Sequence, residues 1–146
     1  MLKKLHSPQL DLTELLRSHG YRATSGRLEI LKVLSAEQKP LSSKEIFEKC
    51  SSKSLDAVTV YRALEAFVVS KIVQRVDLQH GHVDYELSLD GHHHHHIVCK
   101  KCGTMEDVES VDCDKLTKLV QRSSTQFSLI DDHSMELFGV CNACTS

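Results

Sequence analysis

The chain has 146 residues, of which 40% are hydrophobic and 26% charged, the composition of a globular protein that buries a core. No apolar run approaches the roughly 18 residues of a membrane span, so we expect no membrane-spanning segment. The net charge of −2 is uneven, with 13 Lys and Arg against 12 Asp and Glu in residues 1–90 and 5 against 8 in residues 91–146.

The first half of the chain has the pattern of four helices. Apolar residues recur three or four positions apart in each, as on the buried face of an amphipathic helix. Three of the helices have a recognisable start: Thr24 or Ser25 before the second, the capping box Ser42-x-x-Glu45 before the third and Asp56 before the fourth. The apolar positions are Leu12, Leu15, Leu16, Leu28, Leu31, Leu34, Ile46, Phe47, Val60, Leu64, Phe67 and Val68.

The hydrophobic pattern then changes to alternation, which is typical of strands. Residues 72–78 are the first expected strand. After the turn Gln79-His80-Gly81, Val83, Tyr85 and Leu87 alternate with His82, Asp84 and Glu86 in a second strand. Short helices followed by a β-hairpin predict a winged-helix domain.

A winged helix presents its last helix to the major groove of DNA. Here that helix carries Thr59-Val60-Tyr61-Arg62, with Val60 on its buried side. A tyrosine ring can contact a thymine methyl group, and an arginine can bind phosphate or guanine. We therefore expect Thr59, Tyr61 and Arg62 to contact DNA.

A smaller α/β unit follows. We expect residues 1–88 to form the winged helix, 89–91 a hinge and 92–146 the second unit, for an α+β chain overall. The second unit should contain strands from His93 to Cys99, from Thr104 to Val108 and from about His133 to Val140, with a helix from about Asp112 to Arg122. So short a segment needs a metal staple or a partner to be stable.

Two pairs of cysteines predict a zinc site. Cys99-x-x-Cys102 and Cys141-x-x-Cys144 each place two sulfurs on one tight turn, and together they supply the four ligands of tetrahedral Zn(II). The alternative is a pair of free or redox-active dithiols. We expect a cytoplasmic protein, in which thiols stay reduced, and we expect Cys50 and Cys113 to be inert free thiols.

Five consecutive histidines, His92 to His96, lead directly into the first cysteine pair. If this segment is a strand, His94 and His96 point to one face and His93 and His95 to the other. Two separate nitrogen-rich sites are then expected, unless the run is only a solvated polar strand. Further potential ligands are Glu86 and His82 on the polar face of the wing strand, and Asp107, Asp114 and His133 in the second unit.

These features together resemble the ferric uptake regulator family of metal-dependent transcriptional repressors. The resemblance runs from about Leu10 to Cys144 and rests on four elements. They are Gly20-Tyr21-Arg22-Ala23-Thr24 with Arg27, the helix Thr59-Val60-Tyr61-Arg62, the histidine run with Cys99-x-x-Cys102-Gly103, and His133-Ser134 before the last cysteine pair. On this basis Arg22 and Arg27 join the candidate DNA contacts.

The resemblance implies a winged-helix domain hinged to a dimerisation domain, and three metal sites. The four cysteines would hold structural zinc. A regulatory site between the domains would match Glu86, His94 and His96, and a further site in the dimerisation domain would match His93, His95, Asp114 and His133.

The chain departs from the family pattern at two positions. The family usually supplies a regulatory histidine from the loop before the third helix, where this chain has Lys39-Pro40-Leu41. We infer that either His82 or His80 on the wing replaces it or the site has fewer ligands. Many iron sensors carry an acidic residue at the position of His95, so its imidazole favours zinc. Asp107 matches an aspartate of the family's peroxide-sensing members.

We therefore expect a homodimeric repressor that binds double-stranded operator DNA when its regulatory site holds Zn(II), Fe(II) or Mn(II), and that controls metal uptake or homeostasis. It should use no organic cofactor and should not be an enzyme, because no nucleophile, phosphate loop or cofactor fingerprint is present. The alternatives are a peroxide-sensing repressor of the same family and a metal-storage or chaperone protein.

Overall fold

The computed structural model describes residues 10–88, 95–109 and 111–145. The chain divides into two compact units, with residues up to 89 in the first and those from 90 onward in the second. The expected hinge at 89–91 and the candidate ligands His93 and His94 lie outside the described residues. In the described part of the chain, no helix has the length and apolar character needed to cross a bilayer.

The first unit contains the four expected helices, α1 (Leu12–Ser18), α2 (Ser25–Ala36), α3 (Ser43–Lys49) and α4 (Ala57–Val69). Their starts confirm the capping signals. Thr24 accepts a hydrogen bond from the backbone N–H of Arg27, Asp56 accepts one from Thr59, and Ser42 and Glu45 form a reciprocal capping box.

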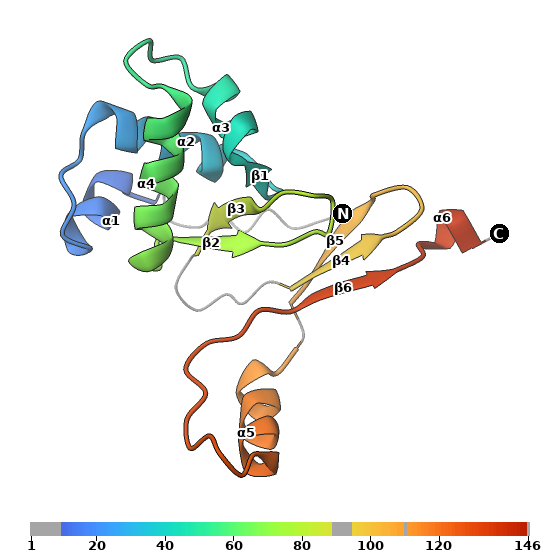
Figure 1. Cartoon of the computed structure of the whole chain (residues 1–146). Helices are drawn as coiled ribbons and strands as arrows, with labels where there is room; N and C mark the ends of the chain where they lie inside the picture. Colours follow the sequence, from blue (N-terminus) through green and yellow to red (C-terminus); the bar gives the residue numbers. More distant parts are fainter. Residues whose placement is uncertain (1–9, 89–94, 110, 146) are drawn as a thin grey trace. The chain divides into compact units, whose positions relative to one another are not determined.

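A three-stranded antiparallel sheet completes this unit. It is formed by β1 (Leu41–Ser42), β2 (Val73–Val76) and β3 (Asp84–Leu87) in the order β1-β3-β2. The hairpin of β2 and β3 was expected, but β1 was not, because two residues are too few to show alternation. Helices followed by this small sheet form a winged helix, as the sequence predicted (Figure 1).

The core of the first unit is apolar and continuous. Its buried side chains come from all four helices and all three strands, and include Leu16, Leu31, Ile46, Phe67 and Tyr85. The wing is also tied to α4 by polar contacts: Glu65 accepts a hydrogen bond of 2.9 Å from the hydroxyl of Tyr85 and pairs with Arg75 of β2. α4 and the hairpin of β2 and β3 are thus joined by both apolar and polar contacts.

The second unit contains β4 (His95–Cys99), β5 (Met105–Val108), α5 (Cys113–Ser123), β6 (Glu136–Gly139) and α6 (Asn142–Thr145). Its sheet has the order β5-β4-β6, in which β4 is antiparallel to β5 and parallel to β6. The last strand is shorter than the expected His133–Val140, and the single turn α6 was not expected.

The second unit differs sharply from the first in what it buries. Among its described residues, those that are buried are His95, His96, Cys99 and Cys113. Each of these side chains can bind a metal ion. Several large apolar side chains are instead exposed: Ile97, Leu116, Leu119, Val120, Phe127, Leu129, Leu137 and Val140. This unit is therefore organised around potential ligands, not around an apolar core.

Candidate metal centres

Four sulfur atoms converge at one end of the second sheet. Cys99 ends β4, Cys102 lies in the turn that follows, and Cys141 and Cys144 come from the chain end after β6. One ligand atom from each lies within 4.8 Å of the others. Gly103 makes the turn possible with a φ of +76°, and its N–H donates to the carbonyl of Cys99 at 2.9 Å. Four thiols in this arrangement fit tetrahedral zinc.

Hydrogen bonds prepare two of these thiols to bind a cation. The backbone N–H of Cys141 donates to Cys99 Sγ at 3.3 Å, and such donors lower the pKa of Cys99 to about 6. The hydroxyl of Thr104 lies 3.2 Å from Cys102 Sγ and lowers the pKa of Cys102. The pKa of Cys144 is raised to about 12, chiefly by its hydrogen bond with Cys141. The sulfur cluster therefore keeps a proton, and a bound cation can replace that proton.

A second cluster combines nitrogen and sulfur. His95 Nε2 lies 2.8 Å from Cys113 Sγ, and the rings of His95 and His133 have their centroids 5.7 Å apart. One ligand atom from each of the three side chains lies within 4.8 Å of the others. His95 is oriented further by a 3.3 Å contact between Nδ1 and the carbonyl of Met135. Cys113, expected to be an inert free thiol, is in direct contact with a buried histidine.

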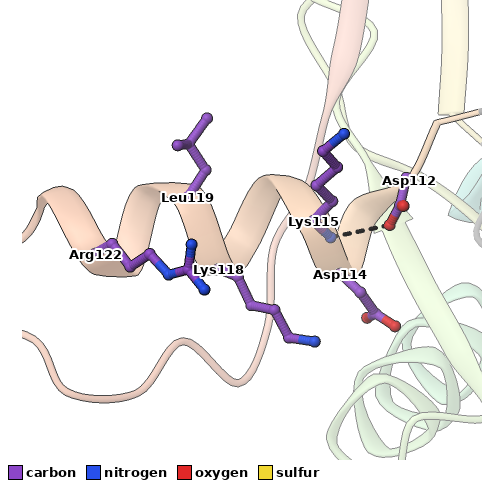
Figure 2. Close-up of a pocket in the computed structure, with 6 residues that line it drawn as sticks. All are labelled: Asp112, Asp114, Lys115, Lys118, Leu119 and Arg122. Carbon is purple, nitrogen blue, oxygen red and sulfur yellow. Dashed lines mark hydrogen bonds between the residues drawn. The ribbon is translucent and has the colours of Figure 1, made fainter.

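The structure brings His95 and His133 together but does not bring Asp114 to them. Successive residues of a helix point about 100° apart, so Asp114 cannot face β4 when Cys113 does. Asp114 is exposed and borders an open depression of about 460 Å³ together with other α5 side chains (Figure 2). In that view Asp114 and Lys118 point to the same side of the helix and Leu119 to the opposite side.

His96 occupies the other face of β4. It is buried, and its Nδ1 lies 2.9 Å from Oδ1 of Asp107, its register partner on β5. The regulatory candidates His96 and Asp107 are therefore in direct contact. Glu86 lies in the first unit, on β3, where it accepts a hydrogen bond from Gln74 of β2.

A third cluster lies in the wing. The imidazoles of His80 and His82 stack with their centroids 3.9 Å apart, and both approach the carboxylate of Asp84. These three side chains also meet the 4.8 Å spacing. The structure thus brings His80 and His82 together with Asp84, a cluster that the sequence did not predict.

The candidate DNA contacts fall into two groups. Thr59, Tyr61 and Arg62 are exposed on α4. Arg22 is also exposed, whereas Arg27 is half-buried and lies 5.2 Å over the ring of Tyr21, with its Nη1 donating to the carbonyl of Arg22 at 3.1 Å. Arg27 therefore shapes the loop that presents Arg22.

Two potential ligands, Cys113 and Asp84, were missed by sequence reasoning. Cys113 stands outside the cysteine pairs, and only its flanking position, between Asp112 and Asp114 at a helix start, could have indicated a polar site. Asp84 alternates with apolar residues as any exposed strand residue does. Asp84 could have been found from its spacing, because it follows His82 by two residues and His80 by four, and a tight turn can bring three such residues together.

Comparison with known proteins agrees with this arrangement. Residues 18–138 match the sequence model of the Ferric uptake regulator family. The ferric uptake regulation protein of Bacillus subtilis is 31% identical over 134 residues, covering 88% of this chain and 89% of that protein. The peroxide-responsive repressor PerR of Staphylococcus epidermidis is 31% identical over 131 residues, covering 88% of this chain and 85% of that one.

A solved structure of the ferric uptake regulator from Francisella tularensis with iron has a TM-score of 0.66 and 30% sequence identity to this chain. It covers 87% of this chain, which in turn covers 96% of that one. The likeness extends over both units.

Proposed function

Because the chain belongs to the ferric uptake regulator family, whose members are metal-responsive transcription regulators, we propose that it is a metal-activated repressor. It binds operator DNA as a homodimer in the cytoplasm when its regulatory site is filled, and it controls metal uptake or homeostasis. The chain uses no organic cofactor and catalyses no reaction.

One observation supports this function above the others: the neighbouring histidines of β4 are both buried, and each meets a different set of donors. His95 faces Cys113 and His133, and His96 faces Asp107. Burying two imidazoles costs free energy unless each is hydrogen-bonded or bound to an ion. A strand that keeps two such sites back to back is suited to sensing an ion.

The donor sets fit three kinds of bound ion. The four thiols of Cys99, Cys102, Cys141 and Cys144 suit structural zinc. The His96 face, with Asp107 and with the resemblance-derived ligands Glu86 and His94, suits a regulatory Zn(II), Fe(II) or Mn(II). The His95 face holds the second site, in which we place Cys113 instead of Asp114. Bound cations supply charge and fix ligand geometry.

The exposed apolar surface of the second unit supports a homodimer. Leu119 and Val120 on α5 are 61% and 51% exposed, and Ile97 and Leu137 on paired strands are 38% and 39% exposed. Several large apolar side chains exposed on one small unit favour a protein–protein contact. Two-fold pairing would present two recognition helices to a pseudo-palindromic operator.

Metal would act on DNA binding through the arrangement of the two units. The histidines of β4 follow directly on the segment that joins the units, so an ion held there restricts their relative movement. Binding then favours the spacing of recognition helices that the half-sites require. By linkage, operator DNA must tighten metal binding by the same factor.

The contact between His96 and Asp107 also supports the alternative of a peroxide-sensing repressor. Asp107 matches the aspartate of such members and lies 2.9 Å from a buried imidazole that bound iron could oxidise. The two functions differ in one measurable respect. Peroxide should release the iron-loaded protein from DNA irreversibly if His96 is oxidised, and should leave the zinc-loaded protein bound.

DNA binding with and without metal tests the proposal. A high-affinity duplex is selected from a random-sequence library separately with Zn(II), Mn(II) and anaerobic Fe(II), and its binding is measured by fluorescence anisotropy. We expect wild-type protein to bind at least about tenfold more tightly with its cognate metal than without, a coupling of about 1.4 kcal/mol. His96→Ala should remove this difference.

The matched control is His19→Ala, because His19 is an exposed histidine in the first unit outside all three clusters. It should keep the full metal response. Equal DNA affinity of wild type and His96→Ala, with and without every metal, would contradict the repressor. A salt-independent affinity would indicate a metal-storage or chaperone protein, which makes no phosphate contacts.

A further inference from the structure

The wing contains a donor set that regulation through β4 does not use. We propose that His80, His82 and Asp84 form a separate divalent-cation site, confined to the wing, for a first-row ion such as Zn(II), Co(II) or Ni(II). Two imidazoles and one carboxylate are suitable ligands for these ions, and three protein ligands leave positions for water.

The hairpin turn is folded so that its histidines converge. Gln79 and Gly81 both have positive φ, +57° and +94°, and the N–H of Gln79 donates to Asp77 Oδ1 at 2.9 Å. This tight turn places the rings of His80 and His82 parallel to within 23° and 3.9 Å apart. The histidine pair is therefore set by local backbone geometry, before any partner or DNA is present.

Asp84 provides the anion at the base of this pair. Its side chain is only 4% exposed and lies on β3, the middle strand of the sheet. Oδ2 lies 2.8 Å from His80 Nε2, while the buried Oδ1 makes no hydrogen bond with any described residue. A buried carboxylate with one unsatisfied oxygen is costly unless a cation or a donor reaches it. His82 Nε2 lies 3.3 Å from Oδ1, on the side from which an ion could reach that oxygen.

The spacing of the donor atoms fits one ion. Ligands about 2.1 Å from a tetrahedral Zn(II) are about 3.4 Å from one another. One ligand atom of each side chain lies within 4.8 Å of the others, and the 3.3 Å from His82 Nε2 to Asp84 Oδ1 is close to that tetrahedral value. The 2.8 Å from His80 Nε2 to Oδ2 is the shorter distance of a direct hydrogen bond, so this ring would have to move outward. A small adjustment of two exposed rings, 39% and 53% exposed, would complete the site without disturbing the core.

The wing site is distinct from the regulatory one proposed on β4. The sequence suggested that His80 or His82 replaces a missing ligand of the regulatory site. In the structure both histidines approach Asp84 of their own hairpin, and Glu86, two residues further, hydrogen-bonds Gln74. The three side chains come from residues 80–84 of one hairpin. They meet without any residue of the second unit.

Filling this site would change the charge of the wing tip. Residues 77–84 contain Asp77 and Asp84 and no lysine or arginine, so a divalent cation would neutralise this segment. A wing that approaches DNA with two carboxylates is repelled by phosphate, and the ion would remove that repulsion. This consequence for DNA rests on the proposed function, whereas the metal site itself does not.

Zinc titration of the full-length protein, with its structural zinc retained, tests the inference. Binding is followed by equilibrium dialysis and by the ring ¹⁵N resonances of the histidines. We expect His80→Ala/His82→Ala to bind one zinc fewer per chain than wild type. In wild type, the coordinated ring nitrogens of His80 and His82 should shift on saturation. Equal stoichiometry, with unshifted resonances, would overturn the site.

Two further variants separate this site from the others. His19→Ala should bind as much zinc as wild type, because its ring lies in none of the clusters. In His96→Ala the wing resonances should still shift with zinc; if they do not, the wing histidines serve the regulatory site and the inference is wrong. The zinc titration does not depend on DNA binding. A failure to bind DNA would therefore refute the proposed repressor function without affecting the evidence for the wing site.

Discussion

At the scale of single residues, Cys113 has the largest chemical consequence. Its thiol lies 2.8 Å from His95 Nε2, whereas the carboxylate of Asp114 is not part of this cluster. Sulfur is a softer ligand than oxygen and favours zinc or cobalt over manganese. The second site of this chain should therefore differ in metal preference from a site built with a carboxylate.

Cobalt spectroscopy can detect this sulfur. With the four-cysteine site kept filled by zinc, Co(II) added to the remaining sites should show sulfur-to-cobalt charge transfer from Cys113. Cys113→Ser should abolish this absorption and weaken Co(II) binding by at least about tenfold, since even outer-shell changes cost 10–100-fold.

Asp114→Asn is the matched control, because it alters the neighbouring residue of the same helix. It should keep both the absorption and the affinity. If Asp114→Asn weakens the site while Cys113→Ser does not, the ligand set implied by the family resemblance is right and the one in the structure is wrong.

The contrast between these two residues shows what sequence could and could not predict. The caps Thr24, Ser42 and Asp56 were predictable, because each interacts with a backbone group three residues away. The contact of Cys113 with His95 joins residues 18 positions apart. The contact depends on how α5 is rotated against β4. A shift of one residue in the start of the helix would turn Asp114, and not Cys113, toward His95.

At the scale of elements, the turn after β4 prepares the zinc site. Its backbone N–H groups contact sulfur, and the Thr104 hydroxyl lies 3.2 Å from Cys102 Sγ and lowers the pKa of Cys102. A thiol with a depressed pKa stabilises the folded state fully above its unfolded pKa of about 8.5, and that contribution is lost as pH falls through the lower folded value. Protons and zinc compete over the same range.

Thr104→Val should therefore make zinc binding more sensitive to acid. Without the hydroxyl the pKa of Cys102 rises, so zinc should be released at a higher pH, by up to about one unit, because solvent weakens the interaction at this exposed position. The measurement is chelator competition between about pH 8 and about pH 5. Thr117→Val, which removes a hydroxyl bonded to the Cys113 carbonyl at 2.9 Å, should leave this release unchanged.

Element-scale prediction succeeded where the pattern was local and long. The four helices and the wing hairpin agreed with periodicity, whereas β1 and α6 did not appear in it. β1 exists because Leu41 and Ser42 pair with Tyr85 and Asp84, more than forty residues away. α6 is one turn that carries Cys144 toward the other sulfurs, and four residues are too few to show a helical period.

At the scale of the whole molecule, the two units depend on different forces. The first has a continuous apolar core, and its wing is pinned to α4 through Glu65. Among the described residues of the second, the buried ones are two histidines and two cysteines, and several large apolar side chains are exposed. A segment of this size buries too little apolar surface to fold on that basis alone, so its stability should come from bound ions and from a partner subunit.

Metal removal should therefore affect the two units unequally. After exhaustive chelation under reducing conditions, amides in residues 95–145 should lose protection from hydrogen exchange, while those in α2, α4 and β3 should keep theirs. Cys141→Ser should produce the same pattern without a chelator, and Cys50→Ser should not, because Cys50 lies in the first unit outside the sulfur cluster. Equal loss of protection in both units would mean that they fold as one cooperative body, and unchanged protection in the second would mean that contacts other than metal coordination hold it together.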